Sequence, residues 1–195
     1  MLVRLRQTLV VFVWLTLVTG IAYPAAVTAV SRLLFPEKAS GSLVRSENGV
    51  VVGSSLVGQS FTDDAHFWGR PSATSPKAYD ATSSGGSNLG PTNPALREAV
   101  ATRLETWKKA CPTCTRRPPI DLVTASASGL DPHVSPMAAR AQIPRVARAR
   151  ALPEADVAAL VERHVEGRTL GVLGEPRVNV LELNLDLERL LRERH

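Results

Sequence analysis

One uncharged segment near the amino terminus constrains this chain more than any other feature. No Asp, Glu, Lys or Arg occurs between Arg6 and Arg32, so residues 7–31 offer 25 consecutive uncharged positions, most of them apolar. A helix of that length measures about 37 Å, enough to span a hydrocarbon core of about 30 Å with some tilt. We therefore predict a transmembrane helix with its exit at residues 7–35, preceded by a short terminus at residues 1–6.

A cleaved signal peptide is the alternative interpretation of this segment. Basic residues precede the apolar run, and Val27-Thr28-Ala29 has the small residues of a cleavage site. The apolar region of a signal peptide, however, usually runs only about 7 to 15 residues. The longer run therefore favours an uncleaved anchor.

The distribution of charge does not orient this helix and does not point to nucleic acid. Basic groups flank the helix evenly, so the positive-inside rule gives no answer. Without Arg4, Arg6 and Arg32 the chain has 20 basic and 18 acidic residues, a net charge of +2 for the rest. The densest basic stretch lacks interleaved aromatic residues, so we interpret it as a solvated or partner-facing helix surface. That stretch contains Arg140, Arg145, Arg148 and Arg150.

Residues 36–195 are predicted to form one mixed α/β (α+β) soluble domain with an aliphatic core. Asn-Gly at 48–49, between β-branched runs, is a strong turn signal, so residues 42–57 should form a hairpin that turns at Glu47-Asn48-Gly49. Elsewhere, spacings of three and four indicate helices, and short or alternating apolar runs indicate strands. The further predicted elements are a helix from Pro94 with Leu96, Val100, Leu104 and Trp107 on one face, a buried strand at 120–123, a helix capped by Ser135 that starts at Pro136, a helix at about 153–166 with Val157, Leu160, Val161 and Val165 on one face, and a strand to about Leu183 with a helix after Asn184.

A long polar stretch at residues 62–94 is the main candidate for a functional loop. Within it, the backbone amides of Ser84, Gly85, Gly86, Ser87 and Asn88 are a candidate anion cradle. Glycine also serves tight turns, and no basic residue lies between Lys77 and Arg97 to assist a phosphate. Tight turns are therefore the favoured interpretation.

Signatures of catalysis and metal binding are scarce. The sequence has no phosphate loop, zinc-protease motif, nucleophile elbow or Asp-Lys-Thr-Gly phosphorylation site. Asp131 and His133 lie near Ser126 and Ser128, but caps and turn hydrogen bonds explain these residues better than a hydrolase triad. His66, His164 and His195 are isolated in the sequence, so we expect surface or satisfied core roles.

The two cysteines form the sequence Cys111-Pro112-Thr113-Cys114. This is half a zinc site at best, because no second Cys or His pair stands at ligand spacing. We expect a local disulfide or an incidental pair.

The apolar segment carries a stripe of small residues. Thr16, Gly20, Pro24 and Thr28 are spaced by four, so they share one face of a helix where another helix can approach closely. We predict that this face packs against a partner, although small residues are common in transmembrane helices by chance.

Four motifs, in this order, resemble the C subunit of the Kdp potassium-transporting ATPase. The likeness extends from the apolar segment to about Leu190, with its main departure at residues 111–119. The motifs are FWGRPSA at 67–73, SGGSNLGPTN at 84–93, VTASASGLDPH at 123–133 and VNVLELN at 178–184.

The resemblance implies a non-catalytic subunit of a bacterial inner-membrane complex that imports potassium at the expense of ATP. Its partners would be an ATP-hydrolysing P-type subunit, a channel-like subunit that selects potassium, a small membrane subunit and the lipid bilayer, with no nucleic acid. ATP and magnesium would bind the ATPase subunit, and this chain would hold no cofactor of its own. The amino terminus would lie in the cytoplasm and the domain in the periplasm.

The resemblance also implies a catalytic-chaperone role, in which the subunit raises the ATP affinity of the ATPase subunit. A periplasmic domain meets essentially no ATP, so we expect any coupling to pass through helix contacts or subunit conformation. The domain is expected near the outer mouth of the potassium-selective subunit, with partner-facing loops that carry Arg70, Asn93, Ser128, Asp131 and His133. A membrane-anchored extracytoplasmic hydrolase and an envelope-binding module are the alternatives.

Overall fold

The structure is a computed structural model that describes residues 1–46, 48–112, 114 and 117–193. Three residues of the sequence-based predictions lie outside these residues: Glu47 of the expected turn, Thr113 between the cysteines, and His195. The chain divides into two compact units, Met1–Leu43 and Val44–His195.

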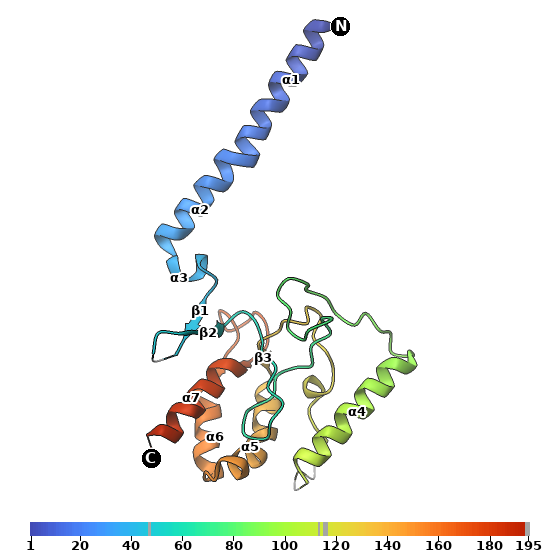
Figure 1. Ribbon diagram of the computed structural model, residues 1–195, viewed down its shortest axis with the longest axis vertical. Helices are drawn as coiled ribbons and strands as arrows, with labels where there is room; N and C mark the ends of the chain where they lie inside the picture. Colours follow the sequence, from blue (N-terminus) through green and yellow to red (C-terminus); the bar gives the residue numbers. More distant parts are fainter. Residues whose placement is uncertain (47, 113, 115–116, 194–195) are drawn as a thin grey trace. The chain divides into compact units, whose positions relative to one another are not determined.

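The first unit is almost entirely helical. Residues Leu2–Leu34 run as one helix, long and apolar enough to cross a membrane, as the blue part of Figure 1 shows. This finding confirms the predicted transmembrane helix and starts it before residue 7. Its parts are α1 (Leu2–Leu17), the π-helical turn η1 (Val18–Ala22) and α2 (Tyr23–Leu34), and the short α3 (Pro36–Ala39) follows.

The π-helical turn η1 has a local cause in Pro24. Proline has no N–H to donate, and its ring clashes with the carbonyl four residues earlier, which here belongs to Gly20. At the end of η1 the N–H of Tyr23 donates to the carbonyl of Val18, five residues back. The wider turn makes room for the proline ring without breaking the helix.

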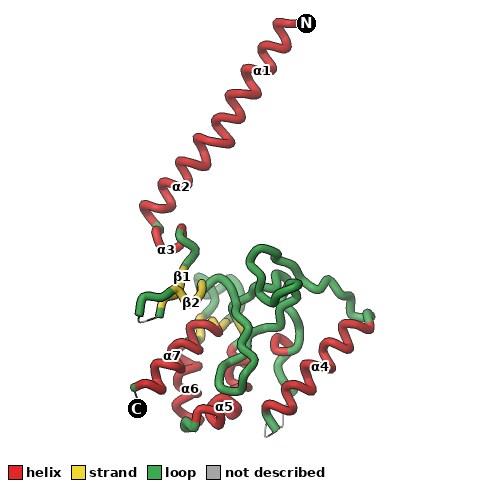
Figure 2. The backbone as a smooth tube through the Cα atoms, in the orientation of Figure 1, coloured by secondary structure: helices red, strands yellow, loops and turns green. Residues whose placement is uncertain are grey.

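Among the residues that the structure describes, the second unit combines two small sheets with four α-helices and long loops, the loops drawn in green in Figure 2. Strands β1 (Leu43–Arg45) and β2 (Val51–Ser54) pair, which confirms the strands of the predicted hairpin. The other sheet is antiparallel, with the order β3 (His133–Val134), β5 (Arg177–Asn179), β4 (Val165–Glu166). Val178 at its centre is the register partner of both Val134 and Val165.

The helices α5 (Pro136–Arg150), α6 (Glu154–Arg163) and α7 (Val180–Arg192) gather on one side of this unit, and α4 (Pro94–Ala110) lies on the other (Figure 1). The buried core is mainly aliphatic, as predicted. Only the last turn of α4 is buried, at Trp107, while Leu96, Val100 and Leu104 are half-buried. The core contains Phe67, Trp107, Cys111, Leu122, Val134, Ala138, Ala139, Val146, Ala147, Val157, Leu160, Val161, Val178, Val180, Leu183 and Leu187.

Two helix starts follow the local chemistry of their caps. The Ser135 hydroxyl accepts a hydrogen bond from the Ala138 N–H at 3.1 Å, and Pro136 is the first residue of α5, as predicted. The Asn93 side chain accepts from the Ala95 N–H at 2.9 Å at the start of α4. Each cap and the N–H group that it accepts from lie within three residues of one another, which is why the sequence reveals these helix starts.

The predicted buried strand at residues 120–123 is wrong. Ile120–Leu122 form a 3-10 turn, η2, in which the N–H of Leu122 donates to the carbonyl of Pro119. Ile120 is 72% exposed, so only part of this apolar run contributes to the core. Prolines at 118 and 119 favour a turn start, and a short apolar run alone does not distinguish a strand from a helical turn.

The predicted strand from Val178 to about Leu183 exists but is too long, because β5 ends at Asn179 and α7 starts at Val180. The Asn179 side-chain oxygen accepts from the N–H groups of Leu181 and Glu182, and the helix starts five residues earlier than predicted. The alternating leucines are compatible with both structures, so the buried cap decides between them.

The predicted helix at 153–166 is too long. α6 ends at Arg163, and Val165 belongs to β4 instead of the helical apolar face. Pairing of Val165 with Val178 in the sheet overrides the helical periodicity.

Candidate functional site

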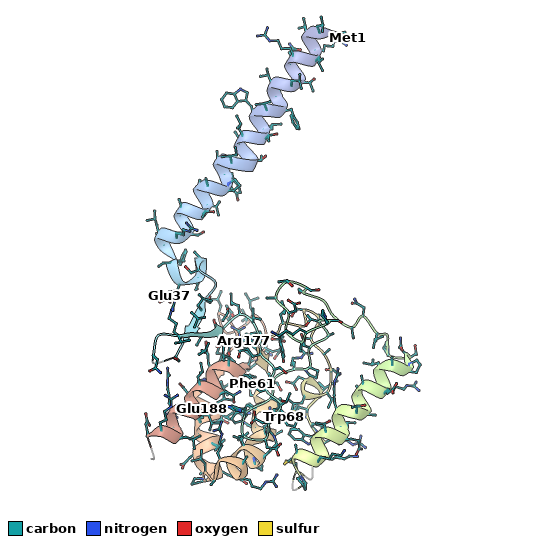
Figure 3. The ribbon with its side chains drawn as sticks, in the orientation of Figure 1. Met1, Glu37, Phe61, Trp68, Arg177 and Glu188 are labelled. Atoms are coloured by element: carbon teal, nitrogen blue, oxygen red, sulfur yellow. A yellow bond between two sulfur atoms is a disulfide. The ribbon has the colours of Figure 1, made fainter. Side chains whose placement is uncertain are left out.

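A loop segment at residues 61–70, here called the strap, is held against α5 and α7 by two buried side-chain amides. Asn184 of α7 exchanges two hydrogen bonds with the backbone of Phe67, at 2.8 and 3.0 Å. Gln142 of α5 does the same with Trp68, at 2.7 and 3.1 Å. Each side-chain amide thus satisfies both the N–H and the carbonyl of one strap residue, as a neighbouring strand would do in a sheet. Phe61 and Trp68 appear between α7 and α4 in the view of Figure 3.

Beneath the strap lies Arg145, which is fully buried. Its guanidinium donates to the carbonyls of Asp63 at 3.2 Å, Asp64 at 2.7 Å and His66 at 2.9 Å. It also stacks over the Trp68 ring, 4.1 Å from the centroid. Burial, only partly offset by the charges of Asp64 and Asp63, lowers the pKa of Arg145 to about 10, so the side chain is cationic at neutral pH.

This arrangement corrects the interpretation of residues 140–150 as a solvated or partner-facing surface. Arg140 and Arg148 are exposed, and Arg140 pairs with Glu162 at 2.6 Å. Arg145 and Arg150, in contrast, face the strap, where Arg150 donates to the carbonyl of Ala65 at 2.7 Å. Charge patterning alone does not show which arginines find buried carbonyl partners.

His66 and His164, the two of these histidines that the structure describes, have satisfied structural roles, as expected. His66 contacts Asp63 at 2.8 Å through one ring nitrogen and Glu188 at 3.2 Å through the other. His164 contacts Asp186 at 3.0 Å. Both therefore tie loops or helix ends to α7.

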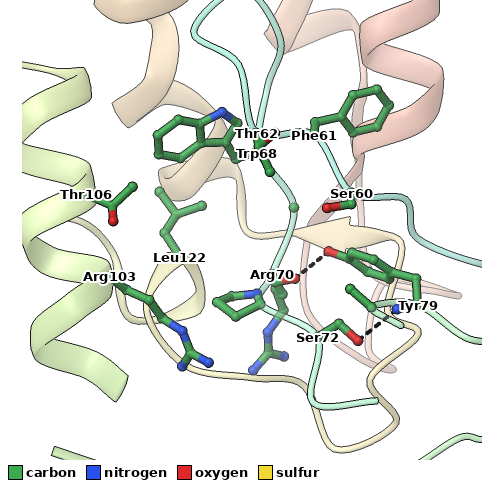
Figure 4. Close-up of a pocket in the computed structure, with 13 residues that line it drawn as sticks. Ser60, Phe61, Thr62, Trp68, Arg70, Ser72, Tyr79, Arg103, Thr106 and Leu122 are labelled. Carbon is green, nitrogen blue, oxygen red and sulfur yellow. Dashed lines mark hydrogen bonds between the residues drawn. The ribbon is translucent and has the colours of Figure 1, made fainter. Parts of the chain in front are cut away.

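A cavity of about 230 Å³ opens between the strap, the following loop and α4 (Figure 4). Trp68, Phe61 and Leu122 give it apolar walls. Its charged lining residues are two arginines, Arg70 and Arg103. The remaining lining residues are Ser60, Thr62, Gly69, Pro71, Ser72, Ala78, Tyr79 and Thr106.

The strap and Tyr79 are fixed to one another beside this cavity. The Tyr79 hydroxyl donates a short hydrogen bond to the Arg70 carbonyl, and the Tyr79 N–H donates to the Ser72 hydroxyl at 2.9 Å. Burial, aided by Asp131, raises the pKa of Tyr79 to about 12, so the phenol stays protonated. Gly58 and Gly69 lie so close to this side chain that an added Cβ would meet a ring carbon at 2.4 Å from Gly58 and the hydroxyl oxygen at 2.8 Å from Gly69.

Four of the five predicted partner-facing residues lie in or against the loop segment at 125–133. Arg70 reaches Asp131 at 3.4 Å and the Ala125 carbonyl at 3.2 Å. Asp131 accepts from the His133 N–H at 3.0 Å, and the Ser128 hydroxyl accepts from the Leu130 N–H at 3.1 Å. The fifth, Asn93, instead caps α4.

These hydrogen bonds favour turn roles over a hydrolase triad. The Ser126 hydroxyl is buried and accepts from the Gly129 N–H at 2.9 Å. Among the described residues, the recorded side-chain partner of the His133 ring is Asp131, at 3.5 Å, and not a serine.

The candidate anion cradle packs against the same segment. The Gly85 N–H donates to the Ser128 carbonyl at 2.9 Å, and the Ser84 hydroxyl donates to it at 3.1 Å. A Cβ at Gly86 would meet the Ala127 carbonyl oxygen at 2.8 Å. The Gly85 amide is therefore already used within the domain, while Ser87 and Asn88 are exposed. Anion binding by this loop stays a prediction.

The Cys111–Cys114 pair forms a disulfide directly after α4. Cys111 is 1% exposed and belongs to the core, and its N–H donates to the Trp107 carbonyl at 2.9 Å. The disulfide therefore holds the buried end of α4 in place. Of the two interpretations left open for the cysteines, the local disulfide is confirmed.

The face of the membrane helix that is predicted to pack against a partner contains Thr16, Gly20, Pro24 and Thr28. It has open space around Gly20, with nothing within 4 Å of an added Cβ. Thr16 folds its hydroxyl back onto the Phe12 carbonyl at 2.8 Å, so this polar group is satisfied within the helix. Pro24 and Thr28 follow in α2, after the wide turn η1.

Sequence reasoning missed the buried polar residues that organise the site. Gln142, Arg145, Asn179 and Asn184 act over long sequence separations, so no local pattern reveals them. A polar residue inside an otherwise apolar helix face, such as Asn184 between Leu183 and Leu187, is the one signal that was present.

Comparison with known proteins agrees with the motifs. Residues 5–189 match the KdpC family, described as "K+-transporting ATPase, c chain". The chain is 58% identical to the potassium-transporting ATPase KdpC subunit of Sorangium cellulosum (strain So ce56), over 96% of this chain and 98% of that protein. It is also 58% identical to the KdpC subunit of Dechloromonas aromatica (strain RCB), over 94% of this chain and 96% of that protein. The chain therefore belongs to the KdpC family of potassium-transporting ATPase subunits.

Proposed function

We propose that the chain is the non-catalytic accessory subunit that assembles and stabilises an ATP-driven potassium import complex. Family membership over residues 5–189, which includes both the membrane helix and the domain, carries this proposal. In this role the helix packs against partner helices, and the domain lies near the outer mouth of the potassium-selective subunit. ATP and magnesium bind the ATPase subunit, potassium is the transported ion, and a small membrane subunit completes the set of partners.

The helix face with Gly20 is the part of the proposal that a single substitution tests. Gly20→Leu fills the open space on the predicted face and should reduce the yield of partner subunits that co-purify with the chain. Ala26→Leu is the matched control, because two residues from Pro24 correspond to a rotation of about 200° around the helix. Equal yields for the two variants would show that this face does not pack against a partner.

The proposed orientation places the amino terminus in the cytoplasm of a bacterial cell and the domain in the periplasm. The Cys111–Cys114 disulfide supports this orientation, because disulfides persist in the periplasm and are rare in the cytosol. Ser87→Cys, on the exposed loop, should react with a membrane-impermeant maleimide in intact cells. Val3→Cys should react only after lysis, and the opposite pattern would reverse the orientation.

The proposed coupling to ATP is indirect. A periplasmic domain that binds partners differently in two states of the complex can raise the ATP affinity of the ATPase subunit without touching the nucleotide. Removal of the chain should raise the KM for ATP of the remaining complex, while the purified full-length chain should not bind labelled ATP. Tight binding of ATP to the chain alone would favour direct contact.

A further inference from the structure

Two arginines, Arg70 and Arg103, line the same cavity between the strap, the following loop and α4, which is unusual for groups of like charge. Figure 4 shows the guanidinium groups of Arg70 and Arg103 at the same end of the cavity. Both donate to carbonyls of one short segment: Arg103 to Val123 at 2.9 Å and Arg70 to Ala125 at 3.2 Å. The segment thus holds two positive charges together, which costs free energy unless an anion lies between or beside them.

The charges around the two arginines are not balanced. Asp131 lies 3.4 Å from Arg70, at the outer limit of a hydrogen bond, and it is shared with His133. Among the described residues, no carboxylate is recorded as a partner of Arg103, and burial lowers the pKa of its guanidinium. The Arg70 Nε atom is buried and has no hydrogen-bond partner among those residues. The site therefore keeps one net positive charge.

The rest of the cavity selects the kind of anion. Trp68 and Leu122 present apolar surfaces at the end away from the guanidinium groups (Figure 4). A volume of about 230 Å³ admits a small organic molecule. A single net positive charge matches a monoanion better than a dianionic phosphate, and guanidinium groups match the planar geometry of a carboxylate.

We propose that this cavity binds an organic carboxylate, whose oxygens pair with Arg70 and Arg103 while its hydrocarbon part lies against Trp68 and Leu122. The inference goes beyond the proposed assembly role and does not depend on it. Either a free carboxylic acid or a carboxylate of a partner subunit supplies this chemistry.

Titration calorimetry of the full-length chain in detergent, with benzoate as the probe, tests the proposal. Arg103→Gln removes one charged donor and should weaken benzoate binding by about tenfold or more. Benzamide has the same ring without the charge and should bind at least about tenfold more weakly than benzoate. No detectable binding of benzoate, or equal binding of benzamide, would overturn the proposal.

A second variant keeps the test valid if Arg103→Gln fails to fold. Thr106→Phe fills the cavity from an exposed position on α4 and leaves both arginines in place. Thr102→Phe, one turn earlier, is the matched control: it is equally exposed, its hydroxyl also donates to the carbonyl four residues back, and it does not line the cavity. Benzoate binding should be lost in Thr106→Phe and retained in Thr102→Phe, and equal binding by both variants would show that benzoate binds elsewhere.

Titration of the intact complex distinguishes the two sources of the carboxylate. Benzoate affinity equal to that of the isolated chain shows an open cavity and a free ligand. Loss of benzoate binding in the complex, together with weaker co-purification of the Thr106→Phe variant, shows that a partner carboxylate fills the same cavity.

Discussion

Single residues organise the domain through long-range hydrogen bonds, and Arg145 makes the largest number of these contacts with the strap. Its guanidinium donates to three carbonyls of the strap, a segment that is neither helix nor strand. Gln142 accepts from Arg145 at 2.7 Å and in turn holds Trp68. Loss of this one side chain thus removes all of these hydrogen bonds at once.

Replacement of Arg145 by Ala should lower the free energy of unfolding by about 3 kcal/mol or more, because it removes a fully buried side chain together with its hydrogen bonds to the strap. Urea unfolding of the chain in detergent, followed by tryptophan fluorescence, measures this loss. Arg148→Ala, on the exposed side of the same helix, should cost only about 0.5 kcal/mol. Equal losses would mean that burial of Arg145 contributes nothing to stability.

Asp131 should make part of the stability depend on pH. Burial would raise its pKa, but hydrogen bonds with the His133 side chain and backbone, together with the charge of Arg70, outweigh burial and lower the pKa. A carboxyl whose pKa is lower in the folded state stabilises the fold above its unfolded value of about 4, and this contribution is lost as the pH falls through the folded pKa. The free-energy gap between wild type and Asp131→Asn should therefore be larger at about pH 7 than at about pH 3. A gap that does not change with pH would contradict this expectation.

At the scale of secondary-structure elements, the sequence predicted well those elements whose ends depend on nearby residues, and predicted poorly those whose ends depend on distant contacts. Ser135 and Asn-Gly at 48–49 act within a few residues, so the start of α5 and the strands of the hairpin followed from the sequence. The start of α7 depends on Asn179, whose side chain is buried and also donates to the Ser55 carbonyl at 2.9 Å. A contact across 124 residues leaves no trace in local periodicity. The residues of the candidate site were predicted unevenly for the same reason. Arg70 belongs to the recognisable motif at 67–73, whereas Arg103 belongs to none of the four motifs.

Asn179→Ala should lower the free energy of unfolding by about 2 kcal/mol or more, because it removes both the cap of α7 and the hydrogen bond to the Ser55 carbonyl. Asn93→Ala removes the exposed cap of α4 and should cost only about 1 kcal/mol. Urea unfolding of both variants gives the comparison. The same cost at both positions would indicate that the contact with Ser55 adds nothing to the cap.

On the scale of the whole molecule, the two units are expected to be separable. A chain that begins at Ser42 retains both strands of the hairpin and every core residue of the second unit. It should unfold cooperatively in urea without detergent. The urea concentration at its unfolding midpoint should equal that of the domain in the full-length chain. A chain that begins at Ser42 and ends at Asn179 keeps β5 but lacks α7, and it should not fold. Aggregation of the first chain would mean that the membrane helix is needed for the fold.

The strap also fixes the order in which the protein can be completed during synthesis. Phe67 leaves the ribosome 117 residues before Asn184, the residue that satisfies its backbone. The membrane helix can therefore be inserted while the loops of the domain still lack their partners, because α7 is the last of the described elements to be made. In a nascent chain stalled before α7, the Phe67 backbone would lack its hydrogen-bond partner Asn184. Proteases and chaperones are expected to bind the chain in that state.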